Sequence, residues 1–347
     1  MPTTGCGCGP SMAPGSGCSP LALPPEGLHR HCTVVGGPDS HDPQARRRQP
    51  TVHRTWSPLL LRPYLWKDFT MTAVLSETPN RLTELVVDLT DTFFFDHALD
   101  HIPGMLLFNA LLDAAWQSEA DSAEAAGVSP PGLAGRLRAD VRFTKICELD
   151  LPTTLGVAAG GDSWRAAATQ SDHVVCTADF DFVHAAPQVY SLGQIVGTEP
   201  AVADLVHRHR DANILVGRTH RDADGLCQAL LLSAPAGHPL HSTDPDYRTP
   251  VEIVEAARQF VISLEHTEYG IAIDTQMLWL SVVMDIPLRI PRSVPITLRH
   301  THREGEGRRA TCGMTLVEAV TGAELGTLTF SLCNLSPSRY AQMRGAS

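Results

Sequence analysis

The fold is decided by one stretch of the chain, Phe93-Phe94-Phe95-Asp96-His97-Ala98-Leu99-Asp100-His101-Ile102-Pro103-Gly104-Met105-Leu106-Leu107-Phe108-Asn109-Ala110-Leu111-Leu112-Asp113-Ala114-Ala115-Trp116-Gln117. Two Asp-His pairs stand directly before a Pro-Gly turn, and the turn leads into a run of good helix formers with hardly a charge. Such a helix must be buried on nearly all sides. A sheet that wraps around one central helix provides this burial. It would also hold both histidines near the helix N-terminus, where backbone N–H groups are free and the helix dipole is positive.

The two Asp-His pairs have two interpretations. In the first, Asp96, His97, Asp100 and His101 form a hydrogen-bonded turn that caps the helix. In the second, they carry acid–base chemistry, because a histidine titrates near neutral pH and a neighbouring carboxylate fixes its tautomer. Two pairs at the mouth of one buried helix favour the second interpretation.

The composition is that of an ordinary globular protein, with 43% hydrophobic and 19% charged residues among 347. A formal net charge of −11 argues against a nucleic-acid partner, and no apolar run is long enough to cross a membrane. Cys6 and Cys8, with His29 and His31, fit no standard metal-site spacing, so neither a metal nor a cofactor is predicted. Five further cysteines stand singly in apolar segments, which is typical of reduced thiols in a cytoplasmic protein: Cys147, Cys176, Cys227, Cys312 and Cys333.

Residues 1–70 are rich in Gly, Pro, Ser and Arg and show no sustained helical or strand period. They lack the continuous apolar segment of a signal peptide. Met71 opens a segment of ordinary composition. We therefore expect residues 1–70 to be a disordered N-terminal extension, or translation to begin at Met71.

Residues 80–184 have the pattern of one helix followed by an antiparallel meander. A first strand is expected over Arg81–Thr90 and the helix over Gly104–Ala126, with Ser129-Pro130-Pro131-Gly132 after it. Gly160-Gly161-Asp162 and Ser171-Asp172 are hairpin-turn sequences. The meander strands are expected at Leu137–Ile146, Thr154–Ala159, Trp164–Thr169 and Val174–Phe182.

The same order of elements returns after a polar connector at residues 185–211. A second apolar helix is expected over Val251–His266, and His238-Pro239-Leu240-His241 takes the place of His97-Ala98-Leu99-Asp100. The sequence therefore predicts an α+β protein of two tandem domains, 80–184 and 212–335, each an antiparallel sheet wrapped around a central helix, that form a pseudo-dimer. The strands of the second domain are expected at Ile214–Val216, Leu226–Ser233, Met277–Met284, Ile296–His300, Ala310–Glu318 and Leu325–Leu332.

Two motifs resemble those of one known family. The motif Asp96-His97-x-x-Asp100-His101-x-Pro103-Gly104-Met105 resembles the signature of the A-factor biosynthesis (AfsA-like) proteins, bacterial γ-butyrolactone synthases built from two hotdog domains. Glu255-Ala256-x-Arg258-Gln259, followed by His266 and Tyr269-Gly270, is similar to the helix motif of the same family. The resemblance covers residues 80–335 and implies that both domains have the hotdog fold.

The resemblance also implies an activity. Members of this family join a β-ketoacyl group, delivered on acyl carrier protein, to the hydroxyl of dihydroxyacetone phosphate. The ester then closes to a butenolide, the precursor of a diffusible lactone signal that controls secondary metabolism. The implied function is thus an acyltransferase, with acyl carrier protein and dihydroxyacetone phosphate as partners.

The first helix departs from the family pattern. Asn109-Ala110-Leu111-Leu112-Asp113 replaces Glu-Ala-x-Arg-Gln, whereas the second half keeps that motif but lacks the Asp-His pattern. In hotdog enzymes the two central helices lie side by side, and the active site forms between them. We therefore expect His97 or His101 to meet Glu255 in one working site, and His238 or His241 to meet Asn109 in a degenerate one.

The residue types at the first helix suit acyl transfer. One of the two histidines would be the base, and the aspartate beside it would fix its tautomer. The backbone N–H groups of Gly104 and Met105 would stabilise the oxyanion of the thioester carbonyl. The candidate catalytic residues are thus His97, His101, Asp96, Asp100 and Glu255.

On the second helix, Glu255 would orient or deprotonate the second reactant. Arg258 lies one turn further on nearly the same face and would meet the phosphate, and Gln259 of the same motif is a further substrate-binding candidate. An ordinary ion pair between Glu255 and Arg258 is the alternative, and close backbone packing is the alternative role for Gly104. Trp116 and Trp279 are expected in the core rather than at the substrate.

Two other functions stay open. A hotdog dehydratase or thioesterase would use the same histidine and glutamate to activate β-elimination or water. A non-catalytic acyl-binding or scaffolding protein would account for Asn109 and the altered second half as lost activity.

Overall fold

The structure is a computed structural model that describes residues 79–130, 134–186, 188–193, 198–242 and 244–345. All of them belong to one unit of the chain, Arg62–Ser347. The extension predicted for residues 1–70, with its cysteines and histidines, lies outside the described residues.

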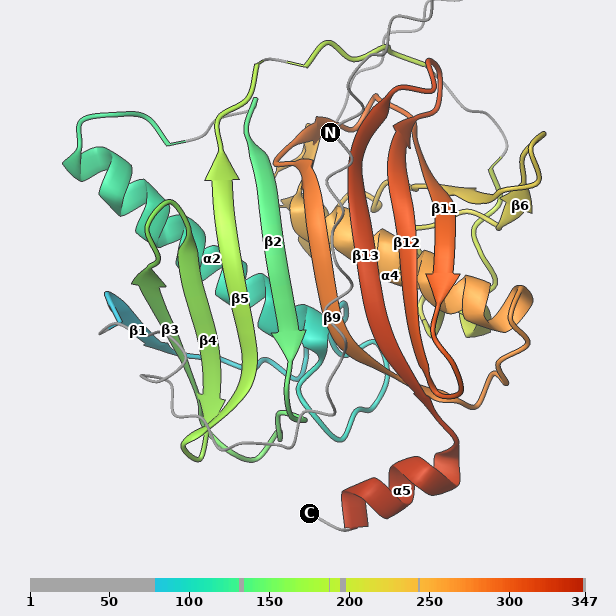
Figure 1. Cartoon of the computed structure of the whole chain (residues 1–347), viewed down its shortest axis with the longest axis horizontal. Helices are drawn as coiled ribbons and strands as arrows, with labels where there is room; N and C mark the ends of the chain where they lie inside the picture. Colours follow the sequence, from blue (N-terminus) through green and yellow to red (C-terminus); the bar gives the residue numbers. More distant parts are fainter. Residues whose placement is uncertain (1–78, 131–133, 187, 194–197, 243, 346–347) are drawn as a thin grey trace, which may run out of the picture. The chain divides into compact units, whose positions relative to one another are not determined.

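Eleven strands form one antiparallel sheet in the order β1-β3-β4-β5-β2-β9-β13-β12-β11-β7-β6 (Figure 1). A separate pair is formed by β8 (Tyr247–Arg248) and β10 (Ile290–Pro291). The first half of the sheet consists of β1 (Arg81–Glu84), β2 (Arg136–Phe143), β3 (Thr153–Ala159), β4 (Trp164–Gln170) and β5 (His173–Val183). The second half consists of β6 (His220–Arg221), β7 (Cys227–Leu230), β9 (Gln276–Pro287), β11 (Ile296–Glu304), β12 (Arg309–Glu318) and β13 (Glu324–Leu335).

The two halves have the same topology. If the two-residue edge strand β6 is set aside, reading inward gives β1-β3-β4-β5-β2 in the first half and β7-β11-β12-β13-β9 in the second. The halves join where β2 pairs with β9, for example Val141 with Val282. The internal repeat in the sequence therefore corresponds to a duplicated fold. The protein is an α+β double hotdog, as predicted.

Each half contributes one long helix to the same side of the sheet (Figure 1). Helix α2 (Gly104–Ala125) packs on β3, β4 and β5, and α4 (Pro250–Thr267) packs on β9 and β13. The two helices also contact each other. Phe108 of α2 and Phe260 of α4 are completely buried, because each helix lies between the sheet and further chain segments.

Short elements complete the fold. They are the 3-10 helices η1 (Ala203–Val206) and η2 (Asp211–Asn213) and the helices α3 (Pro239–Ser242) and α5 (Pro337–Gly345). Ser171 and Asp172 have φ values of 47° and 63° in the turn between β4 and β5, which is the primed geometry that matches the twist of a two-residue hairpin. That turn was expected from the sequence.

Two expected strands differ in the structure. The first strand ends at Glu84 instead of Thr90, because Asp88 accepts hydrogen bonds from the N–H and hydroxyl of Thr90 and turns the chain. Ile214–Val216 is not a continuous strand. The Leu215 N–H donates to the side chain of Gln259 at 2.8 Å, so it does not take part in a strand ladder.

The remaining core expectations concern tryptophan and cysteine. Trp116 and Trp279 are partly buried and pack against the hydrophobic core. Four cysteines are buried free thiols and a fifth is half-buried: Cys147, Cys176, Cys227, Cys312 and Cys333, in that order. Among the described helices, none is long and apolar enough to span a membrane.

Candidate active site

Helix α2 begins without a side-chain cap. Its N-cap is Pro103, and the described residues make no side-chain cap hydrogen bond at this end of the helix. The interpretation of the Asp-His pairs as a helix cap is therefore wrong. The Pro103 carbonyl accepts from Leu106 and Leu107, whereas within the described residues the N–H groups of Gly104 and Met105 have no hydrogen-bond partner. Both stay available to an oxyanion.

Gly104 lies against aromatic rings of the sheet. A Cβ atom at this position would lie 3.1 Å from Trp279 and 3.3 Å from Phe143. The close approach that the sequence offered as an alternative role for Gly104 is therefore present, although its partners are side chains rather than backbone. Close packing and a free N–H are compatible, because they involve different sides of the residue.

The carboxylate of Asp96 is buried, with 1% of its side chain exposed. It accepts hydrogen bonds from the backbone N–H of His209 and from the side-chain amide of Asn213 at 2.7 Å. Asn213 also donates to the Thr92 carbonyl at 2.7 Å. Asp96 thus ties the loop before α2 to the segment that contains η2, and it holds the position of His97 next to it in the chain.

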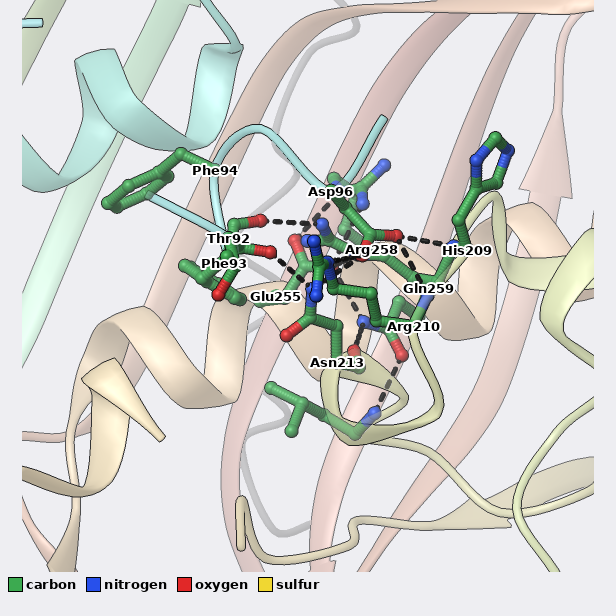
Figure 2. A network of polar contacts seen from close by, with 12 residues as sticks. Thr92, Phe93, Phe94, Asp96, His209, Arg210, Asn213, Glu255, Arg258 and Gln259 are labelled. Atoms are coloured by element: carbon green, nitrogen blue, oxygen red, sulfur yellow. Dashed lines mark hydrogen bonds and ion pairs between the residues drawn. The ribbon is translucent and has the colours of Figure 1, made fainter. Parts of the chain in front are cut away.

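Glu255 is completely buried in α4 and holds two arginines (Figure 2). Its Oε1 accepts from Arg208 at 2.6 Å and from Gln259 at 2.7 Å, and its Oε2 accepts from Arg258 at 2.8 Å. Burial alone would raise the pKa of Glu255, but Arg208 and Arg258 hold it at about 2. Glu255 is therefore a fixed negative charge. The ion pair with Arg258, the alternative raised from the sequence, is present.

His97 lies within the electrostatic reach of the same arginines. Burial lowers its pKa, and the charges of His209, Arg208 and Arg258 lower it further against the opposing charge of Asp96. Its ring centroid is 4.8 Å from that of His209. Its Nδ1 is buried and has no hydrogen-bond partner within the described part of the chain. His97 is thus neutral near pH 7, with a buried Nδ1 that no described residue pairs with.

The polar network of Figure 2 is a cationic cluster, which we define by five charged residues: Arg208, Arg210, Arg258, Asp96 and Glu255. Three arginines face two carboxylates, so one positive charge is in excess. Of the two arginines that pair with Glu255, Arg258 is the more accessible, with 22% of its side chain exposed compared with 6% for Arg208. Its Nη1 makes no hydrogen bond to any described residue.

Gln259 is completely buried and its amide is used within the protein. Its Oε1 accepts from the Leu215 N–H, and its Nε2 donates to Glu255 and, at 2.7 Å, to the Asn213 carbonyl. This arrangement favours a structural role over substrate contact. Contact between Gln259 and a substrate remains a prediction.

Of the two histidines expected beside Asn109 in the degenerate site, His238 has other partners. His238 Nε2 donates to Asn213 Oδ1, 2.9 Å away, and its ring packs edge-on against Phe93. The side chain of Asn109 contacts Asp113 on its own helix at 3.4 Å. His238 therefore belongs to the polar network around Asp96.

The second Asp-His pair lies in a different group. His101 Nδ1 donates to Asp100 at 2.7 Å, and Glu148 pairs with His101 through an isolated β-bridge. Tyr340 of α5 donates to Asp100, and Arg344 of α5 contacts both Asp100 and Glu148. We call these five residues the Asp100 cluster: Asp100, His101, Glu148, Tyr340 and Arg344. The structure thus brings His97, and not His101, to the residues around Glu255.

The sequence analysis missed the segment His207-Arg208-His209-Arg210, which it placed in the connector. Arg208 is buried against Glu255, and its Nη1 donates to the Phe93 carbonyl at 2.8 Å. His207 Nε2 lies 2.9 Å from His266 Nε2, and His266 Nδ1 donates to the Ile271 carbonyl. Four alternating His and Arg residues were the available signal.

The fold and the geometry at the two helices define the class of protein, a double hotdog. Hotdog proteins are typically enzymes that act on acyl thioesters. Residues 198–336 match the family model of the AfsA A-factor biosynthesis hotdog domain. This match supports the resemblance stated from the sequence, over the second half of the chain. No curated protein matches the chain.

Several solved structures are similar to the chain. The dehydratase domain of PpsC from Mycobacterium tuberculosis, in complex with C12:1-CoA, is 13% identical, with a TM-score of 0.50 over 73% of this chain and 92% of that one. A variant of the GphF dehydratase DH1 is 13% identical, with a TM-score of 0.49 over 74% and 92%. A putative thioesterase from Novosphingobium aromaticivorans is 15% identical, with a TM-score of 0.45 over 67% and 87%. At these identities the likeness concerns the fold alone.

Proposed function

We propose that this protein is an acyltransferase that joins a β-ketoacyl group, carried as a thioester on acyl carrier protein, to the hydroxyl of dihydroxyacetone phosphate. The match of residues 198–336 to the A-factor biosynthesis hotdog domain supports this reaction class. The single observation that carries the proposal is the excess of arginine over carboxylate around Arg258, next to a neutral histidine.

A positive site is unexpected in this protein, because its formal net charge is −11. Buried arginines normally occur with enough carboxylates to neutralise them. Arg258 directs two of its nitrogens to Glu255 and keeps Nη1 free of described partners. A phosphate dianion on an incoming substrate would compensate the excess charge, and a guanidinium binds phosphate through several parallel hydrogen bonds.

His97 is the better of the two candidate bases. Its lowered pKa keeps the ring neutral at pH 7, so it can accept a proton, and Arg258 lies within its electrostatic reach. In the proposed step, His97 takes the hydroxyl proton as the oxygen attacks the thioester carbon. The C–O bond forms, the oxyanion is held by the N–H groups of Gly104 and Met105, and the C–S bond then breaks. The carrier thiolate leaves and takes up the proton.

Glu255 takes a different part from the one expected of a base. Because Arg208 and Arg258 keep its pKa at about 2, it is an acceptor of hydrogen bonds and not of protons at neutral pH. We assign it the task of fixing Arg258 in the orientation that meets the phosphate. It is thus a positioning residue in the proposed mechanism.

The test is a mass-spectrometric assay of the full chain with a β-ketoacyl thioester, with and without dihydroxyacetone phosphate. A phosphorylated ester or butenolide should form only when both substrates are present. His97→Ala should lower the rate by at least about 100-fold, as loss of a general base typically does. His184→Ala, at an exposed histidine of the first half, is the matched control and should leave the rate unchanged.

Other products would replace the proposal with one of its rivals. Release of free β-keto acid at the same rate with or without dihydroxyacetone phosphate would identify a thioesterase. A dehydrated acyl product from a β-hydroxyacyl thioester would identify a dehydratase. Acyl binding without any turnover would identify a non-catalytic acyl-binding protein.

A further inference from the structure

Helix α5 lies at the end of β13 (Figure 1). Polar side-chain contacts hold it to the loop before α2. None of its residues Pro337–Gly345 is buried. Apolar burial therefore does not account for its position. Its contacts instead converge on Asp100, which is about 240 residues away in the chain and stands beside His101.

Three side chains donate hydrogen bonds to the Asp100 carboxylate. They are the Tyr340 hydroxyl at 2.8 Å, Arg344 Nε at 3.1 Å and His101 Nδ1 at 2.7 Å. Arg344 Nη2 also donates to the Asp100 carbonyl at 3.2 Å. Partial burial opposes the effect, but the hydrogen bonds from His101 and Tyr340 lower the pKa of Asp100. Because an ionised carboxylate only accepts hydrogen bonds, the proton shared between Asp100 and His101 belongs to His101 Nδ1.

Arg344 joins both chain segments that flank His101. Its Nη1 and Nη2 form a bidentate pair with Glu148 at 2.6 and 2.7 Å, while its Nε reaches Asp100. Glu148 is the β-bridge partner of His101. Since one guanidinium bridges both carboxylates, its removal would leave Asp100 and Glu148 to repel each other without a cation between them. Half of the Asp100 side chain is exposed, so it could then turn into solvent.

We propose that Tyr340 and Arg344 are positioning residues that hold Asp100 on His101, so that His101 keeps its Nδ1–H tautomer and presents Nε2 at the mouth of α2. Within the described residues, Nε2 of His101 has no hydrogen-bond partner. The use of this nitrogen as a second acid–base group rests on the proposed acyl transfer. The tautomer itself does not depend on that function.

The experiment measures the His101 tautomer by ¹⁵N NMR on the full chain at pH 8. In the wild type the Nδ1–H form should dominate. In the double variant Tyr340→Phe, Arg344→Ala the Nε2–H form should gain at least about tenfold relative to Nδ1–H, as expected when one charge-assisted hydrogen bond of about 1.5 kcal/mol is lost. Arg344→Lys should recover part of the wild-type ratio, because lysine keeps the charge but not the bidentate pair.

Arg339→Ala is the matched control, since Arg339 is an exposed arginine of the same helix. It should leave the tautomer ratio unchanged. In the acyl-transfer assay, the double variant should lower kcat about tenfold with an unchanged KM for dihydroxyacetone phosphate. Unchanged His101 tautomers in the double variant would overturn the positioning role, even if activity falls. If the wild type makes no phosphorylated product, the proposed function fails, and the NMR result still decides the positioning role.

Discussion

Replacement of Glu255 by glutamine tests the polar network most severely. The substitution keeps the size of the side chain and an oxygen acceptor. Among the described residues, however, it removes the only carboxylate that Arg208 contacts at hydrogen-bond distance. Arg208 is 6% exposed at its side chain, so its charge would stay buried without compensation. We expect Glu255→Gln to destabilise the fold strongly.

The magnitude follows from the pKa of Glu255, which folding lowers from 4.5 to about 2. Each pKa unit corresponds to about 1.4 kcal/mol, so ionisation of Glu255 stabilises the folded chain by roughly 3 kcal/mol at neutral pH. Removing one partner of a buried ion pair typically costs about 3–5 kcal/mol, which agrees. Because the pKa is lower in the folded state, this stability is fully present above pH 4.5 and is lost as the pH falls toward 2.

The assay is urea unfolding of the wild type and of Glu255→Gln, followed by the fluorescence of the tryptophans at several pH values. Glu124→Gln, at an exposed glutamate of α2, is the control and should change the free energy of unfolding by less than about 0.5 kcal/mol. The difference between wild type and Glu255→Gln should shrink below pH 4.5. A Glu255→Gln variant as stable as Glu124→Gln at pH 7 would refute the reasoning.

Three further predictions concern single residues. Because its pKa is below the ordinary value, His97 should stay neutral through pH 7, so kcat/KM should fall only on the acid side of pH 6.5; an acid limb centred above pH 7 would contradict this assignment. Burial and His266 lower the pKa of His207 to about 4, so the free energy of unfolding should fall by up to roughly 3 kcal/mol between pH 6.5 and pH 4, as His207 is protonated more readily in the unfolded chain. Urea unfolding of His207→Gln should lack this pH-dependent loss of stability. Gly104→Ala would place a methyl 3.1 Å from Trp279 and should lower the free energy of unfolding by about 1 kcal/mol; a gain in stability would show that the contact yields without cost.

The sequence predicted the fold well because its strongest signals are local. The apolar helices at Gly104 and Pro250 begin within one residue of the expected positions, since a Pro-Gly or Thr-Pro sequence marks each start. The repeat of elements predicted a duplicated fold, and the strand order shows it. Strand ends were less predictable. The turn at Asp88 and the use of the Leu215 N–H by Gln259 depend on side-chain contacts that no periodicity reveals.

The site was only partly predictable for the same reason. The resemblance to hotdog enzymes predicted that His97 or His101 would meet Glu255, but it gave no way to foresee that Arg208 of the connector would pair with Glu255. Arg208 lies in a loop, where the sequence has no helical or strand periodicity that would indicate a buried side chain. The sequence also did not predict that His97 and His101 belong to different polar groups, because the contacts of α5 with Asp100 come from the far end of the chain.

The central claim is that the cationic cluster binds the phosphate of the acyl acceptor, and a comparison of two acceptors tests it most directly. The measurement is kcat/KM for dihydroxyacetone phosphate and for dihydroxyacetone, with the wild type and with Arg258→Ala. A charge-assisted pair with phosphate contributes about 1.5–3 kcal/mol, so the wild type should prefer the phosphorylated acceptor by at least about tenfold, and Arg258→Ala should lose most of that preference. An equal preference in the wild type and in Arg258→Ala would contradict the proposed phosphate site.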